Sequence, residues 1–176
     1  MNIFVLDSNP FKAAAAVDCV RVPKMVVESA QMMASALRRW GATDEQMPVA
    51  KTSGKPYRGG YKHHPCTVFA GETRTNFKWL AHHAEALLDE YYQRFGKVHA
   101  CHNPIYQMSG MSRMIPEGDL TPFAQAMPDE YKHENAVTAY RAYYHSKRFS
   151  NGPPRWDRSP TGAPKWWVEP TLEVTA

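Results

Sequence analysis

Apolar residues recur with the period of an α-helix in three stretches of the chain, 24–40, 75–95 and 134–148. Pro23 suits the first turn of the first stretch, and Gly96 suits the end of the second. The sequence therefore predicts three long amphipathic helices whose apolar stripes form one core. The large side chains expected to be mostly buried there are Trp40, Trp79, Leu80, Leu87 and Tyr91.

The intervening sequence lacks this period. Residues 3–6, Ile-Phe-Val-Leu, predict a short buried strand, and residues 42–64 and 101–122 predict two long loops. The predicted fold class is mainly α: a single domain of three long helices plus short helices, one short N-terminal strand and two long loops. Residues 1–150 form its helical core domain, and 151–176 form an extended C-terminal segment that packs on the core or trails from it.

Length and composition fit one ordinary globular domain. The chain has 176 residues, of which 43% are hydrophobic and 22% are charged. It contains no run of about 18 apolar residues that would span a membrane. The first residues lack the basic start of a secretory signal. Widely spaced cysteines, Cys19, Cys66 and Cys101, argue against a disulfide framework and for a reducing cytoplasm.

Positive charge gathers in the first predicted loop. The net charge is only +4, but no acidic residue falls between Glu45 and Glu72. Cations on such a loop bind phosphates, interleaved aromatic rings stack on bases, and Gly59-Gly60 lets the backbone approach a ligand. A glycine-containing cationic loop equally suits a pyrophosphate or a nucleotide, and the remaining alternative is a solvated loop without a partner. The residues expected to bind nucleic acid are Lys51, Lys55, Tyr57, Arg58, Tyr61 and Lys62, with Lys147 and Arg148 from the third helix.

Histidines and cysteines raise the question of a metal site. The chain has 8 His and 3 Cys. It has no Cys-x-x-Cys pair, however, and no His-Glu-x-x-His on a helix. We therefore expect no metal and no other cofactor.

A polar set on the first long helix suggests acid–base chemistry. Lys24, Glu28 and Gln31 follow one another at i, i+4 and i+7, which places them on one face. A carboxylate in a cleft is a candidate general base, with Lys24 and Gln31 orienting a substrate. An ordinary surface ion pair between Lys24 and Glu28 explains the same spacing.

Further candidates lie in other segments. His64 ends the basic loop, Gln125 lies between two prolines, and Tyr140 and Arg141 lie on the third helix. Tyr140 and Arg141 also suit the edge of a core, where their polar ends reach solvent. Polar residues on helices that pack by apolar stripes face solvent or one another. We therefore expect one cleft lined by Lys24, Glu28, Gln31, His64, Gln125, Tyr140 and Arg141.

Several segments together resemble a family of small proteins of tailed bacteriophages, over residues 1–150. The resemblance rests on Lys24-Met25 with Glu28 and Gln31, His64-Pro65-Cys66-Thr67, Asn76-Phe77-x-Trp79-Leu80, Glu90-Tyr91, Gly96-Lys97-x-His99, Pro122-x-x-Gln125-Ala126-Met127-Pro128-x-x-Tyr131 and Ala139-Tyr140-Arg141-x-Tyr143-Tyr144. It extends to helical, DNA-glycosylase-like phage proteins that transfer amino acids onto pyrophosphorylated 5-hydroxymethyluracil in DNA.

This resemblance implies a DNA-base-modifying transferase in the host cytoplasm. Its partners would be double-stranded phage DNA and a free amino acid, with no membrane and no cofactor. Two alternatives stay open: a non-enzymatic nucleic-acid-binding protein, for example one that blocks a host defence, and a base-excision enzyme. The catalytic residues would be Glu28, Lys24 and His64, and the substrate-binding residues Gln31, Arg21, Gln125, Tyr140 and Arg141.

One segment departs from the family pattern. Members of the family carry Asp-Lys-His where this chain has Cys19, Val20 and Arg21. If that histidine is catalytic, either Asp18 and Arg21 compensate for its loss or this chain is inactive.

Overall fold

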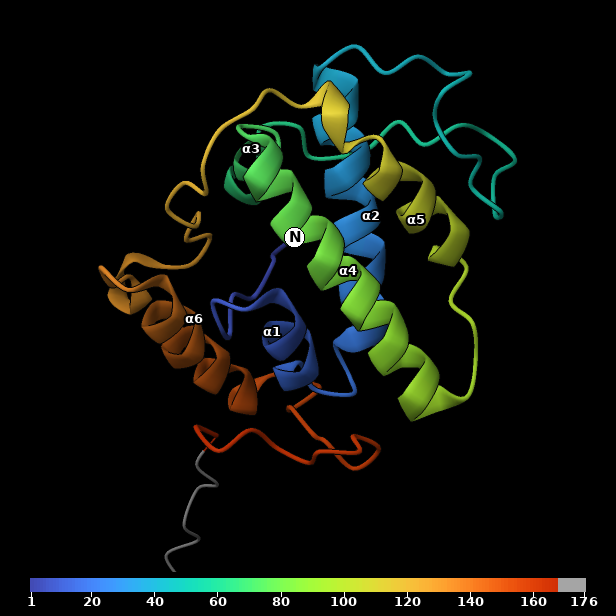
Figure 1. Ribbon diagram of the computed structural model, residues 1–176. Helices are drawn as coiled ribbons and strands as arrows, with labels where there is room; N and C mark the ends of the chain where they lie inside the picture. Colours follow the sequence, from blue (N-terminus) through green and yellow to red (C-terminus); the bar gives the residue numbers. More distant parts are fainter. Residues whose placement is uncertain (168–176) are drawn as a thin grey trace, which may run out of the picture.

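The computed structural model describes residues 1–167, so the predicted segment 151–176 lies partly outside the described residues. The architecture is mainly α, a single compact domain with no sheet among these residues, which confirms the predicted fold class. The helices are α1 (Pro10–Ala16), α2 (Val22–Arg39), α3 (Pro65–Ala70), α4 (Arg74–Phe95), α5 (His102–Gly110) and α6 (Ala136–His145), with 3-10 turns at Ser112–Met114, Asp129–Tyr131 and Ser146–Phe149 (Figure 1).

Two long helices, α2 and α4, form the centre of the domain. α4 packs against both α2 and α1, and it crosses α2 in Figure 1. The Thr73 side chain caps the start of α4 by accepting the Asn76 N–H, and Gly96 ends the helix in the left-handed conformation at φ +64°. The predicted burial of Trp79, Leu80 and Leu87 is confirmed, and Tyr91 is half-buried.

Trp40 is not in the core, contrary to the prediction from its helical spacing. Its side chain is 43% exposed, and its indole N–H donates to the Gly71 carbonyl at 2.8 Å. The helix ends at Arg39, and the Trp40 backbone turns away from helical geometry. The indole therefore leaves the apolar stripe and caps the surface where α2 meets the end of α3.

The predicted strand at residues 3–6 is also absent. These four residues are buried, but no described residue pairs with them as a neighbouring strand. The Asn2 side chain instead accepts the N–H groups of Ile3 and Phe4, and Phe4 has a positive φ of 40°. An apolar run can be buried in a core without being part of a sheet. Here local hydrogen bonds from the Asn2 side chain take the place of the backbone hydrogen bonds between strands.

The two predicted loops have different outcomes. Residues 42–64 contain no helix, and their only regular pairing is an isolated bridge between Val49 and Pro56. Residues 101–122 contain α5 and a 3-10 turn, so the loop prediction is wrong there. The missed signal is the spacing of Ile105 and Met108, which are fully buried on one side of α5.

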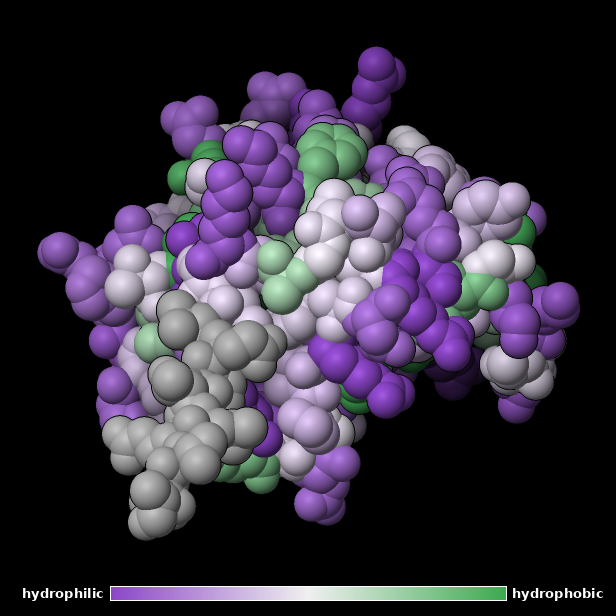
Figure 2. Space-filling model, turned by 90° about the horizontal axis from the view of Figure 1, so that it is seen from below, coloured by the Kyte–Doolittle hydropathy of each residue, from purple (hydrophilic) through white to green (hydrophobic). Residues whose placement is uncertain are grey.

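Residues 151–167 cross the ends of α1 and α6 without forming a helix (Figure 1). The Trp156 indole donates to the Ala16 carbonyl at 3.1 Å, and the Trp167 ring stacks on His145 with centroids 4.8 Å apart. Viewed from below in Figure 2, the surface is mostly polar, with small and separate hydrophobic patches. None of the helices in the described part of the chain is long and apolar enough to cross a bilayer.

Buried His83 should make stability depend on pH. Burial lowers the pKa of His83 from 6.5 to about 4, while a hydrogen bond to the Pro10 carbonyl opposes this shift. The unfolded chain then takes up the proton first as the pH falls, so the native state is favoured above pH 6.5 and loses stability towards pH 4.

We expect the free energy of unfolding to fall by about 2 kcal/mol from pH 7 to pH 5 through this residue alone. Urea titrations at both pH values measure it. The His83→Phe variant should lose this part of the pH dependence, and variant His82→Gln, at an exposed neighbouring position, should keep it.

Candidate functional site

Polar residues interrupt the buried surface of α2 along one face. They recur every three or four positions and form what we call the polar stripe: Arg21, Lys24, Glu28, Gln31, Ser35 and Arg39. The two ends of the stripe line two different cavities. With a rise of about 1.5 Å per residue, Glu28 and Arg39 lie roughly 16 Å apart along the helix axis.

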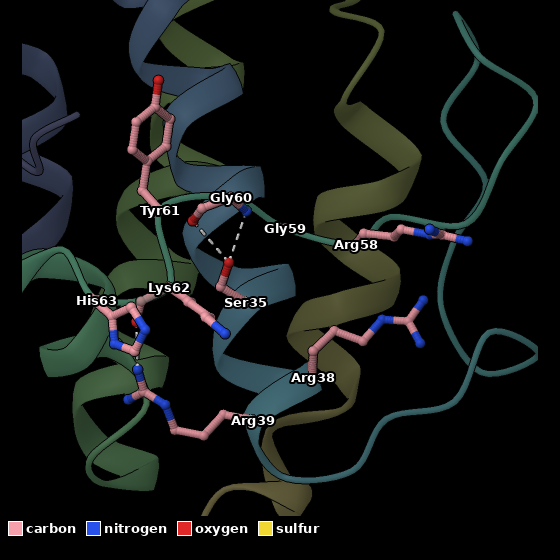
Figure 3. A pocket seen from close by; sticks show the side chains of 9 residues that line it. All are labelled: Ser35, Arg38, Arg39, Arg58, Gly59, Gly60, Tyr61, Lys62 and His63. Atoms are coloured by element: carbon pink, nitrogen blue, oxygen red, sulfur yellow. Dashed lines mark hydrogen bonds between the residues drawn. The ribbon is translucent and has the colours of Figure 1, made fainter.

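The first cavity, which we call the cationic pocket, has a volume of about 500 Å³. It lies between the C-terminal turns of α2 and the glycine-containing loop that precedes α3 (Figure 3). None of its lining residues is acidic. These residues are Ser35, Arg38, Arg39, Arg58, Gly59, Gly60, Tyr61, Lys62 and His63.

Ser35 fixes the glycine loop to α2. Its hydroxyl donates to the Gly60 carbonyl and accepts the Gly60 N–H, both at 2.9 Å (Figure 3). Gly59 has φ +78°, and a Cβ at this position would lie 2.2 Å from the Ser35 Oγ. No larger residue fits there without moving the loop, so the short loop-to-helix distance depends on glycine.

Two of the arginines hold the pocket together. Arg38 donates to the carbonyls of Tyr57 and Ala42 and pairs with Asp44. Arg39 donates to the Lys62 carbonyl at 2.8 Å. These bonds fix the wall of the pocket and leave the net charge of its lining positive.

The other two cations are available to a ligand. The side chains of Arg58 and Lys62 are exposed, and neither makes an ion pair or a side-chain hydrogen bond with any residue from 1 to 167. In Figure 3 the Lys62 ammonium points towards Ser35, and Arg58 extends beside Arg38. Positive groups that surround a cavity without a carboxylate are suited to an anion such as phosphate.

The second cavity, which we call the Glu28 pocket, has a volume of about 290 Å³. Its charged lining residues are Arg21, Lys24, Glu28 and Lys147. Arg21 is the N-cap residue of α2, Lys24 and Glu28 lie in its first turns, and Lys147 lies in the 3-10 turn after α6. The remaining lining residues are Met1, Asn2, Phe4, Met25, Ala126 and Tyr143.

Glu28 is almost buried and holds the N-terminal segment in place. Its Oε2 accepts the Asn2 N–H at 2.8 Å, and its Oε1 lies 3.5 Å from Lys24 Nζ and 3.8 Å from the Met1 amine. Lys24 is 74% exposed, so its ion pair with Glu28 is weak. One carboxylate oxygen thus accepts a structural hydrogen bond, and the other lies among cations in the lining of the Glu28 pocket.

His64 lies near Glu28 without lining either cavity. Its Nδ1 accepts the Cys66 N–H at 3.2 Å and caps the start of α3. Burial and the Met1 amine lower the pKa of His64, and the Glu28 carboxylate opposes them. The ring is therefore neutral at neutral pH, and Nδ1 is already occupied as an acceptor.

Three other predicted site residues do not join Glu28. Both ends of the Gln125 amide bond the His133 backbone, and Tyr140 is fully buried with its hydroxyl donating to the Ala124 carbonyl at 2.6 Å. Arg141 donates to the Leu6 carbonyl and lines a different cavity beside Trp166. The residues predicted to converge on one cleft are thus distributed over different parts of the surface and core. Each of these three side chains instead forms hydrogen bonds with backbone groups of another segment.

Gln31 lies in the polar stripe between the two cavities and lines neither of them. Its amide is partly exposed, and it makes no side-chain hydrogen bond within residues 1–167. Its predicted role in binding the substrate stays a prediction.

The residues predicted to bind nucleic acid also separate. Arg58, Tyr61 and Lys62 line the cationic pocket, and Lys147 lines the Glu28 pocket. Lys51 and Lys55 are exposed outside both cavities. Tyr57 contacts the Cys101 sulfur through its hydroxyl, and Arg148 lies over the Trp167 ring.

Sequence reasoning missed Ser35, Arg38, Arg39 and His63 in the cationic pocket. The available signal was the spacing of Ser35 and Arg39, which continues the period of Lys24, Glu28 and Gln31 by two further turns. No three His, Cys, Asp or Glu side chains in residues 1–167 are grouped so that they could hold a metal ion. Comparison of the chain with protein-family models, curated proteins and solved structures finds no match.

Proposed function

We propose that this protein binds DNA and holds backbone phosphates in the cationic pocket. The observation that carries the proposal is a cavity of about 500 Å³ with four Lys or Arg side chains and no carboxylate in its lining. Phosphate contacts from Lys and Arg supply most of the sequence-independent affinity for DNA. The anchored glycine loop positions two of these cations, Arg58 and Lys62, and leaves their charged groups without an ion pair among the described residues.

Removing these two cations should weaken DNA binding and its dependence on salt. We expect the double variant Arg58→Ala, Lys62→Ala to flatten the slope of log affinity against log salt by about 2, since each lost phosphate contact contributes about 0.9. Fluorescence anisotropy over a salt series measures this slope. A matched control, Lys78→Ala with Lys97→Ala, removes the same charge from exposed positions outside both pockets and should leave the slope unchanged.

The polar stripe leads from the cationic pocket to a carboxylate among three cations, and this supports a reaction at a DNA base. In the proposed transfer, the amine nitrogen of an amino acid or a similar nucleophile bonds to the 5-methylene carbon of an activated 5-hydroxymethyluracil. The carbon–oxygen bond to pyrophosphate breaks, and its electron pair leaves with the pyrophosphate. Glu28 accepts the proton of the amine, and Arg21, Lys24 and Lys147 neutralise the leaving group.

The transfer predicts a defined loss in Glu28→Gln. DNA carrying pyrophosphorylated 5-hydroxymethyluracil is incubated with amino acids, and the nucleosides are analysed by mass spectrometry. We expect a new adduct with the native chain and a rate about 10²- to 10⁴-fold lower with Glu28→Gln, as for loss of a general base. Glu130→Gln, an exposed control, should retain the native rate. If the native chain leaves the DNA unmodified, the transfer reaction is contradicted and only DNA binding remains as the proposed function.

A second candidate function, base excision, is favoured by the Met1 amine 3.8 Å from Glu28. An α-amine becomes a nucleophile once a neighbouring carboxylate accepts its proton. In a chain that starts at Met1, the nitrogen would attack C1′ of a nucleotide. The glycosidic bond breaks, and the base leaves with the electron pair and takes up a proton.

The attacking nitrogen loses a proton and gives a glycosylamine at C1′. The C1′–O4′ bond then breaks, its electron pair stays on O4′, which takes up a proton, and an iminium remains between the Met1 nitrogen and the opened sugar. This intermediate distinguishes the two reactions. Borohydride reduces it to a stable protein–DNA amine. A borohydride-dependent covalent complex with release of a free base supports excision, whereas an adduct nucleoside without cross-linking supports transfer. Acetylation of the Met1 amine should abolish the cross-link and leave DNA binding in place.

A further inference from the structure

Tyr61 occupies an unusual position on the rim of the cationic pocket. Its side chain is 70% exposed, and its backbone has φ +53°, in the left-handed region that favours glycine. A non-glycine residue in this conformation is strained, and such strain is concentrated at binding and active sites. In Figure 3 the ring rises along α2, away from the arginines and from the Lys62 ammonium, on the far side of the glycine loop.

The backbone around Tyr61, rather than packing of its ring, determines this position. The preceding Gly60 is held by Ser35, and the Tyr61 carbonyl accepts the His64 N–H at 2.8 Å. No aromatic ring within residues 1–167 packs against the Tyr61 ring. The loop thus presents a large aromatic face to solvent at the rim of the cationic pocket.

We propose that Tyr61 stacks on an unpaired base of a DNA strand whose phosphate lies in the cationic pocket. This inference rests on the proposed function and specifies its ligand as single-stranded DNA or an unpaired nucleotide. In a duplex the bases are paired in the interior, so a ring adjacent to a phosphate site cannot reach their faces. An aromatic ring beside a cationic groove is the arrangement by which proteins hold single strands.

The neighbouring residues agree with this assignment. Tyr61 and Lys62 are adjacent in the chain and both line the cationic pocket, so one bound strand can contact both residues. A cavity of about 500 Å³ is the size of a small-ligand site and takes a nucleotide rather than a helix of DNA. A free mononucleotide offers the same chemistry, and the experiment below separates it from a strand.

The test compares three ligands by fluorescence anisotropy: a single strand of roughly ten nucleotides, the same sequence as a hairpin duplex, and thymidine monophosphate as competitor. The native protein should bind the strand more tightly than the duplex and much more tightly than the mononucleotide. Tyr61→Asn removes the ring but tolerates positive φ. It should weaken binding of the strand about 5- to 150-fold and leave the duplex affinity and the salt slope unchanged.

Two variants make this result specific. Tyr61→Phe keeps the stacking face and should bind the strand like the native protein. Tyr92→Ala removes another exposed tyrosine, from α4 and outside the pocket, and should also have no effect. A thermal unfolding curve of Tyr61→Asn that matches the native one excludes misfolding as the cause of lost binding.

Failure of the inference is separable from failure of the proposed function. Equal affinities for strand and duplex, or native affinity in Tyr61→Asn, overturn the stacking role while Arg58 and Lys62 still control the salt slope. Competition by the mononucleotide at the strand's own affinity overturns the assignment of a DNA strand. No salt-dependent binding of any DNA by the native protein overturns the proposed function itself.

Discussion

Replacing Arg94 by alanine is expected to lower the free energy of unfolding by about 3–5 kcal/mol, the cost of removing one partner of a buried ion pair. The Arg94 side chain is fully buried on α4 and pairs with Glu90 at 2.6 Å. It also donates to the carbonyls of Val17 and Ala15 at 2.6 and 3.0 Å. These bonds connect α4 to the C-terminal end of α1.

The expected loss has two parts. A shortened side chain leaves the Glu90 carboxylate without its partner in a largely buried position, and two carbonyls lose charged donors. Urea unfolding of both proteins measures the difference. Lys132→Ala is the control, because its ion pair with Asp129 is at the surface and should contribute less than about 1 kcal/mol. Similar small losses in both variants would contradict the structural role of Arg94.

The elements that sequence reasoning located correctly are those determined by local signals. The helices at α2 and α4 follow from apolar spacing, and Pro23 and Gly96 mark the start of α2 and the end of α4. Each signal lies within a few residues of the structure it controls, so tertiary contacts do not need to be known. The length of α6 was overestimated, since its last turn tightens into the 3-10 turn Ser146–Phe149.

The candidate site was less predictable because its polar side chains form hydrogen bonds with segments that are distant in the sequence. Glu28 accepts a bond from Asn2, Tyr140 bonds Ala124, and Arg141 bonds Leu6. The spacing of these residues along the sequence does not indicate any of these hydrogen bonds. Lys24, Glu28 and Arg21 share a cavity because one helix carries them, which is the part of the site that periodicity does determine.

Replacing Trp79 by alanine should cost about 3–5 kcal/mol, as truncation of a buried large aromatic residue does. Its ring is 6% exposed, stacks on His83 with centroids 5.2 Å apart, and meets the edge of Phe123 at 4.9 Å. Its indole N–H donates to the Ser8 carbonyl at 2.7 Å, so the substitution also removes a bond between α4 and the N-terminal segment.

The same substitution should also change how the free energy of unfolding depends on pH. A substitution that only created a cavity would leave this pH dependence unchanged. Trp79 covers one face of His83, whose pKa is lowered by burial. Without the indole, water reaches the imidazole, the pKa rises back towards 6.5, and the loss of stability between pH 7 and pH 5 becomes smaller. Trp40→Ala, at an exposed ring, should cost only about 1–2 kcal/mol and leave this pH dependence intact. A loss below about 1 kcal/mol in Trp79→Ala would place its ring outside the core.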